Sequence, residues 1–168
     1  SYMDVRQALD DLGLTEQECS EIGIRVFKVA MPWPLEPEGV RQFAEGLAEI
    51  LVVEEKRQVV EYQLKEQLYN WRDDVRPRVV GKFDEKGEWV RPHGDWLLPA
   101  ASELTPAMIA RVIAKRIELL GLHPNDADRE RIARRVEFIN QKEAALAKPR
   151  IGIARTPYFC SGCPHNTS

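Results

Sequence analysis

The sequence predicts an α/β protein of three layers, in which a mainly parallel sheet lies between two layers of helices. Short β-branched and apolar segments alternate with helical segments from the start of the chain to about residue 83. The helical segments are long enough to serve as the crossover connections that parallel strands require. In addition, residues 50–53 form a nearly continuous apolar run, which is typical of a strand covered on both faces.

The chain is expected to open with two helices. Residues 4–12 place apolar side chains at helical spacing, and Gly13 supplies a left-handed stop. Thr15 and Glu18 have the spacing of a capping box, which predicts a short helix to about residue 21. Because no strand precedes the first helix, we expect the sheet to lack its first strand.

Three segments are predicted to be strands. Residues 24–29 are rich in β-branched and aromatic side chains, and residues 50–53 are apolar. Residues 78–83 contain two valines and a phenylalanine and are predicted to form the third strand. Helices are expected between them, over about 37–46, with a proline in the first turn, and over about 59–69.

Residues 84–104 are expected to be irregular, because prolines and glycines interrupt them. Within and beside this stretch, residues 82–83 and 89–90 are predicted to pair as a small hairpin across a turn. The four tryptophans lie in irregular segments and suggest a packing or interdomain surface; they are Trp33, Trp71, Trp89 and Trp96.

Two further helices are predicted in the last third of the chain. Thr105 is an expected N-cap for a helix that Gly121 stops, and Asn125 is expected to cap a last helix to about residue 147. That last helix carries an apolar stripe of Ile132, Val136 and Ile139 against a charged face. We expect a domain over residues 1–125, a connecting helix and linker over 126–149, and the start of another unit over 150–168.

The composition excludes several classes of protein. With 168 residues, 43% of them hydrophobic, the chain fits one ordinary domain, and a net charge of −3 gives no support for nucleic-acid binding. No apolar run approaches the roughly 20 residues that span a bilayer. The first residues have no signal-peptide pattern, and the three cysteines do not form a secreted disulfide framework. A cytoplasmic location is the expectation.

The sequence from Cys160 to Asn166 is the strongest candidate site. Two thiols at C-x-x-C spacing, Cys160 and Cys163, are followed by Pro164, His165 and Asn166. Such a loop suits a redox dithiol, a structural zinc site or part of an iron–sulfur site, and it also suits a loop that binds nothing. Either metal site needs further ligands from elsewhere.

The remaining polar candidates are weaker. Glu54 and Glu55 follow a predicted strand, at the edge where α/β sheets bind ligands, although a helix-capping or solvated role is the simpler interpretation. His93 and His123 are expected to be loop residues rather than ligands, and Cys19 is expected to be a small buried side chain.

Five segments together resemble the indolepyruvate ferredoxin oxidoreductase family, and in particular its long, fused bacterial members. They are residues 2–9, 33–37, 51–57, 69–72 and 156–166. The Val-Val-Glu-Glu-Lys-Arg block at 52–57 and the Cys-x-Gly-Cys-Pro-His segment at 160–165 are the most specific of them.

The resemblance implies an enzyme that oxidatively decarboxylates 2-oxo acids, aryl pyruvates such as indolepyruvate in particular, to acyl-CoA. Electrons would pass through 4Fe-4S clusters to ferredoxin, and thiamine diphosphate with Mg²⁺ would carry the carbanion chemistry. A homodimer is also implied, with neither nucleic acid nor membrane as a partner.

The resemblance also assigns roles along the chain. Residues 1–125 would form the transketolase C-terminal-like domain, mainly architectural in role, and residues 150–168 would open the thiamine diphosphate-binding domain. Cys160 and Cys163 would be cluster ligands, and His165, supported by Asn166, would lie near the cofactor's diphosphate. Because the chain lacks the other parts of these sites, it is expected to be inactive alone and to bind no cofactor. The alternative is a non-catalytic α/β interaction module whose tail is a zinc or cluster clip.

Overall fold

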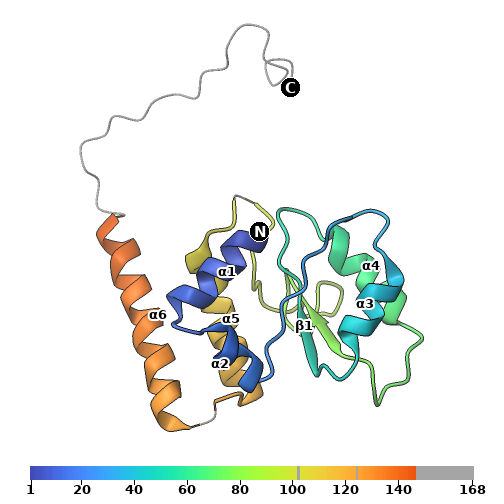
Figure 1. Ribbon diagram of the computed structural model, residues 1–168. Helices are drawn as coiled ribbons and strands as arrows, with labels where there is room; N and C mark the ends of the chain where they lie inside the picture. The colour runs from blue at the N-terminus through green and yellow to red at the C-terminus, as the bar shows by residue number, and fades with distance from the viewer. Residues whose placement is uncertain (102, 124, 147–168) are drawn as a thin grey trace, which may run out of the picture.

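The computed structural model describes residues 1–101, 103–123 and 125–146, which form an α/β structure (Figure 1). In chain order the elements are α1 (Tyr2–Asp11), α2 (Glu16–Glu21), α3 (Pro37–Ala44), β1 (Glu49–Leu51), α4 (Val59–Leu68), β2 (Arg78–Val80), α5 (Pro106–Leu120) and α6 (Asp126–Leu146). The α/β class is confirmed. The described sheet has two strands, so the larger three-layer, transketolase-like arrangement stays a prediction.

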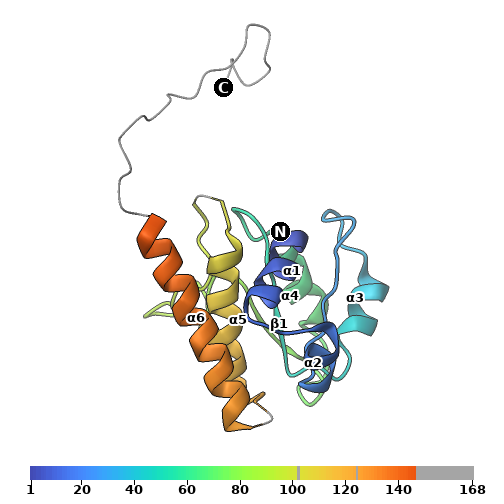
Figure 2. The same cartoon turned by 60° about the vertical axis from the view of Figure 1, so that its left-hand side comes forward.

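The two strands form a parallel pair between groups of helices. Ile50 of β1 is in register with Val79 of β2. Helices α1, α5 and α6 lie on one side of the pair and α3 and α4 on the other, and Figure 2 shows α6 running alongside α5. None of the helices in the described ranges is long and apolar enough to cross a membrane.

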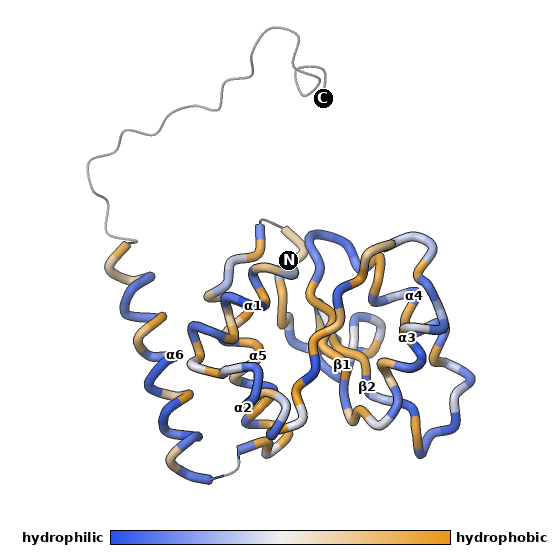
Figure 3. Tube along the Cα trace, in the orientation of Figure 1, coloured by the Kyte–Doolittle hydropathy of each residue, from blue (hydrophilic) through white to orange (hydrophobic). Residues whose placement is uncertain are grey.

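Side chains of β1 and the residues after it alternate between two apolar cores. Ile50 and Val52 are buried with residues of α3 and α4, whereas Leu51 and Val53 pack against the core of α1, α5 and α6. Alternation is the geometry of a strand, and here both faces are covered. The apolar run at 50–53 therefore has the two-sided burial that the sequence predicts. Figure 3 shows the hydrophobic tube of β1 between the two groups of helices.

The predicted helix ends are confirmed. Thr15 and Glu18 form a reciprocal capping box at α2, and Thr105 accepts a hydrogen bond from the backbone N–H of Met108 at α5. Gly121 ends α5 with a φ of 63°, a left-handed conformation that favours glycine. Asn125 accepts a hydrogen bond of 2.9 Å from the Asp128 N–H at the start of α6.

Two predictions about strands are wrong. Residues 24–29 form no strand, since no backbone hydrogen bond in the described part of the chain joins residues 25–29 to a neighbour. The hairpin does not pair residues 82–83 with 89–90; Phe83 instead bridges Trp96 in antiparallel fashion. A wider loop explains the difference, because the Leu97 N–H donates to the Lys82 carbonyl and leaves residue 89 outside the pairing.

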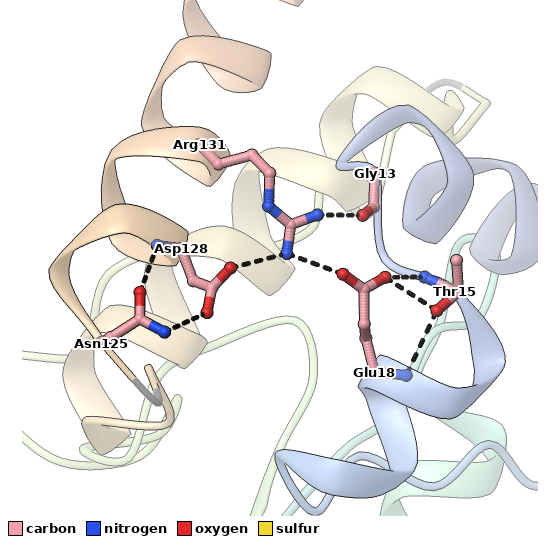
Figure 4. A network of polar contacts seen from close by, with 6 residues as sticks. All are labelled: Gly13, Thr15, Glu18, Asn125, Asp128 and Arg131. Atoms are coloured by element: carbon pink, nitrogen blue, oxygen red, sulfur yellow. Dashed lines mark hydrogen bonds and ion pairs between the residues drawn. The ribbon is translucent and has the colours of Figure 1, made fainter.

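One arginine fastens α6 to the turn between α1 and α2 (Figure 4). Arg131 donates to the Gly13 carbonyl at 2.5 Å and forms ion pairs with Glu18 at 2.9 Å and Asp128 at 3.0 Å. Beside this network, Ile132 and Ile139 are buried in the same core as α1 and α5, which confirms the predicted apolar stripe. The last helix is therefore held by polar contacts at its start and by apolar packing along its length. Near its end, Glu143 pairs with Arg111 of α5 at 2.8 Å.

Candidate functional site

The four residues with the strongest predicted roles, Cys160, Cys163, His165 and Asn166, lie outside the described residues. Over residues 1–101, 103–123 and 125–146, no group of three or more His, Cys, Asp or Glu side chains is arranged to hold a metal ion. The site that the structure does build lies at the carboxyl end of the parallel strands, where α/β sheets place ligand-binding groups.

Glu54 has a helix-capping role at this edge. Its carboxylate accepts hydrogen bonds of 2.9 Å from the N–H groups of Val59 and Val60, and one of 3.0 Å from that of Glu61. These N–H groups have no partner within the helix, and the positive end of the helix dipole favours a carboxylate there. The capping interpretation of Glu54 is therefore confirmed.

Glu55 reaches in another direction. Its two carboxylate oxygens lie 3.3 Å and 3.2 Å from the backbone nitrogen of Leu104, which donates to them. This contact links the loop after β1 to the approach of α5. Both glutamates of the sequence motif thus bind the chain's own backbone N–H groups.

Lys82 is the largest fully buried side chain in the described part of the structure, with 1% of its surface exposed. Its ammonium donates to the carbonyls of Glu54 at 2.5 Å and Pro99 at 3.0 Å. Burial lowers the pKa of Lys82, while the charges of Glu54, Glu55 and Glu61 act in the opposite direction. This lysine joins the ends of β1 and β2 to the loop that precedes α5.

Glu61 completes the cluster from α4. Glu61 is 2% exposed. Its carboxylate accepts a hydrogen bond of 3.1 Å from the backbone N–H of Lys82 and one of 2.5 Å from the ammonium of Lys65. The fit depends on Gly81, because a Cβ at that position would lie 2.3 Å from a carboxylate oxygen of Glu61. The charged groups of the cluster thus bind other groups of this chain, and the arrangement is that of a structural connection between the strands, α4 and the loop before α5.

A second buried ionic contact crosses from β1 to α5. Glu49 and Arg116 have side chains that are 4% and 6% exposed, and the guanidinium binds both carboxylate oxygens, with 2.8 Å between Nε and Oε1. Arg116 also pairs with Glu85 at 3.0 Å. The hydrogen bonds that Arg116 donates to Glu49 are the first cause of the raised pKa of Arg116.

An apolar groove of about 510 Å³ lies next to β1. One wall is β1 with the residues that follow it, and the other is the extended segment 23–29. Side chains from α1 and α5 line one face, and side chains from α3 and α4 line the opposite face. Its polar groups include the Glu49–Arg116 pair.

The weaker candidates behave as structural residues. His93 contacts the Gly94 carbonyl at 2.9 Å, and His123 contacts Glu118 at 2.7 Å, both in loops as predicted. Cys19 is buried. Trp71 packs against the core of α3 and α4, whereas Trp89 is 84% exposed.

Lys82, Glu61 and the Glu49–Arg116 pair were not found by sequence reasoning. A signal existed for Arg116, which occupies a position on the apolar stripe of α5 at helical spacing from Ile109, Val112 and Ile113. An arginine at such a position requires a buried partner. No comparable local pattern identifies that partner as Glu49, because it lies in a distant strand.

Comparison with known proteins gives a consistent result along the whole chain. The family model described as "Indolepyruvate ferredoxin oxidoreductase middle domain" matches residues 1–149. Over all 168 residues the chain is 29% identical to the indolepyruvate oxidoreductase subunit IorA of Thermococcus kodakarensis, of which it covers 21%. It is 30% identical to the subunit of the same name from Pyrococcus abyssi, covering 20% of it. The chain thus spans about a fifth of the length of these curated relatives. No solved structure matches the chain.

Proposed function

The chain belongs to the indolepyruvate ferredoxin oxidoreductase family, and from that premise we propose that it is the middle segment of an enzyme that oxidises 2-oxo acids. The observation that carries the proposal is similarity over the full chain to two indolepyruvate oxidoreductase subunits, together with the family match at residues 1–149. Aryl pyruvates such as indolepyruvate are the proposed substrates, and the cytoplasm is the proposed location.

The proposed reaction joins decarboxylation to electron transfer. A 2-oxo acid and coenzyme A give an acyl-CoA and carbon dioxide, and an electron pair passes through iron–sulfur clusters to ferredoxin. Thiamine diphosphate with Mg²⁺ supplies the carbanion chemistry when it is bound. The enzyme is proposed to act as a homodimer.

This segment is proposed to have a mainly architectural role. Its buried charged groups, such as Lys82 and Arg116, are used in contacts with other parts of the same segment, which supports that role. We propose a transketolase C-terminal-like domain over residues 1–125, with a three-layer arrangement whose sheet lacks its first strand, and a connecting helix and linker over 126–149. Residues 150–168 would begin the thiamine diphosphate-binding domain.

The donor set of that last part suits the cofactors in its chemistry. Cys160 and Cys163 offer two of the thiolates that a 4Fe-4S cluster needs, and other cysteines must supply the rest. His165 and Asn166 offer N–H groups that can donate to a diphosphate oxygen. The segment alone would therefore bind no cofactor and have no activity.

Anaerobic reconstitution of the full-length polypeptide tests this proposal. Visible absorbance of an iron–sulfur cluster should fall in Cys160→Ala and in Cys163→Ala. Cys19→Ala is the matched control, because that thiol is buried against the α1–α5 core and should leave the absorbance unchanged.

The outcome that contradicts the proposal is equally clear. Zinc recovered in place of iron, with no oxidation of any 2-oxo acid, would favour the non-catalytic interaction module. Full cluster absorbance in both cysteine variants would remove these residues from the ligand set.

A further inference from the structure

We propose that the groove beside β1 is the slot for an additional parallel β-strand, supplied by the stretch of polypeptide that leads into α1. The strand would lie between β1 and residues 24–29 and would join them into one sheet. This inference concerns assembly of the sheet and stands apart from the proposed reaction.

The edge of β1 that faces the groove makes no backbone hydrogen bond to any other segment that the structure describes. Toward β2, the Ala48 carbonyl accepts from the Arg78 N–H at 3.0 Å, and the Val52 N–H donates to the Val80 carbonyl at 2.8 Å. Along a parallel strand, the backbone N–H and C=O groups of successive residues point alternately to the two neighbouring strands. Since Ala48 and Val52 bond to β2, the N–H and C=O of Leu51 point to the edge away from β2. Such groups need partners once they are covered.

The opposite wall of the groove, residues 25–29, also has backbone groups that a strand could bond. Residues 25–29 make no backbone hydrogen bond to another segment within the described ranges, although they are β-branched and aromatic and run beside the groove. In Figure 1 this segment and β1 both rise toward the edge of the molecule at which α1 begins. An extended strand between the two walls would bind backbone on both sides.

The other two faces of the groove are lined by apolar side chains, which favour an apolar strand. Val5 and Leu9 of α1 and Ile113 and Ile117 of α5 line one face. Val40 and Leu64, from α3 and α4, line the opposite one. A strand in this position would be covered on both faces, as β1 is, so its side chains should be apolar in continuous sequence.

The position of α1 identifies the occupant. Ser1 and Tyr2 line the groove together with Glu54, which follows β1. A parallel strand in the slot would end at this same edge and enter α1 directly, which is the connection of a β–α unit. The curated relatives are about five times as long as this chain, so their polypeptides contain residues that can fill the slot.

Hydrogen exchange measured by mass spectrometry tests the proposal on two polypeptides. One is the 168-residue chain, and the other adds about 15 residues of the natural sequence preceding Ser1. The extension should slow amide exchange at least tenfold in peptides that cover residues 24–29 and 49–53, with little change in α6. Equal exchange in the two polypeptides would overturn the proposal.

Two variants and a mass measurement identify what fills the slot. Val26→Asp, in the groove wall, should cancel the protection given by the extension, whereas Val75→Asp, at an exposed site away from the groove, should preserve it. Equal protection in both variants would contradict the slot. Sedimentation should show that the extended polypeptide has no stronger self-association than the shorter one; protection that appears only in a dimer would assign the strand to a second copy and refute our choice of occupant.

Discussion

Removing the buried arginine of the β1–α5 contact should destabilise the fold strongly. In Arg116→Met the carboxylate of Glu49, 4% exposed, would lose both guanidinium hydrogen bonds and stay buried. Breaking a buried ion pair by removing one partner costs about 3–5 kcal/mol, because a buried charge loses its partner. Arg78, half exposed and 3.8 Å from the Glu49 carboxylate, remains as a second cation, so the loss should lie toward the lower end of that range. Urea denaturation of the chain followed by circular dichroism measures the free energy of unfolding.

The refuting result comes from matched variants. Arg129→Met removes an exposed pair with Glu118, whose side chains are 57% and 48% exposed, and should cost about 1 kcal/mol or less. The double variant Glu49→Gln with Arg116→Met should recover part of the loss, since the buried charge that lost Arg116 is gone. If Arg116→Met cost no more than Arg129→Met, the burial argument would be refuted.

Single contacts elsewhere in the fold should also have measurable effects. Gly81→Ala should lower the free energy of unfolding by about 1–3 kcal/mol, because the new Cβ would displace the buried carboxylate of Glu61, and thermal melting by circular dichroism would show it; an unchanged melting temperature contradicts this. The hydrogen bond to Glu88 raises the pKa of Tyr62 to about 12. The stabilisation of the fold by this hydrogen bond is therefore complete below about pH 10 and is lost as the pH rises through 12. In Glu88→Gln the phenol absorbance should titrate at lower pH, and an identical titration would remove that cause. Arg131→Met should speed hydrogen exchange in the first turns of α6, and exchange at the original rate would show that the Arg131 contacts do not hold the helix.

Local signals made most of the helices predictable. A capping box at Thr15, a left-handed Gly121 and a cap at Asn125 act over a few residues, and all three are confirmed. The apolar run at 50–53 also predicts its burial on both faces, because successive side chains of a strand point to opposite faces and all four of these are apolar.

Pairing was less predictable because it depends on distant partners. Residues 24–29 have the composition of a strand, but a strand needs a neighbour to bond, and the space beside them is a groove. The bridge from Phe83 to Trp96 likewise depends on the size of a loop rather than on either residue's propensity.

The candidate site divides in the same way. Glu54 follows a strand and precedes a helix, so its capping role could be inferred from position. Lys82 is buried only because the Glu54 and Pro99 carbonyls converge on its ammonium, an arrangement formed by three separate segments. The spacing of Cys160 and Cys163 indicates that these thiols can bind a metal or act in redox chemistry. Spacing alone does not predict where in the fold the two thiols lie.

The most direct test is turnover by the full-length polypeptide, together with any subunit that purifies with it. The measurement is the anaerobic reduction of ferredoxin after addition of indolepyruvate, with and without coenzyme A and thiamine diphosphate. Our account predicts reduction that requires both additions and yields an acyl-CoA. A polypeptide that binds thiamine diphosphate but reduces no ferredoxin with indolepyruvate or any other 2-oxo acid would contradict it.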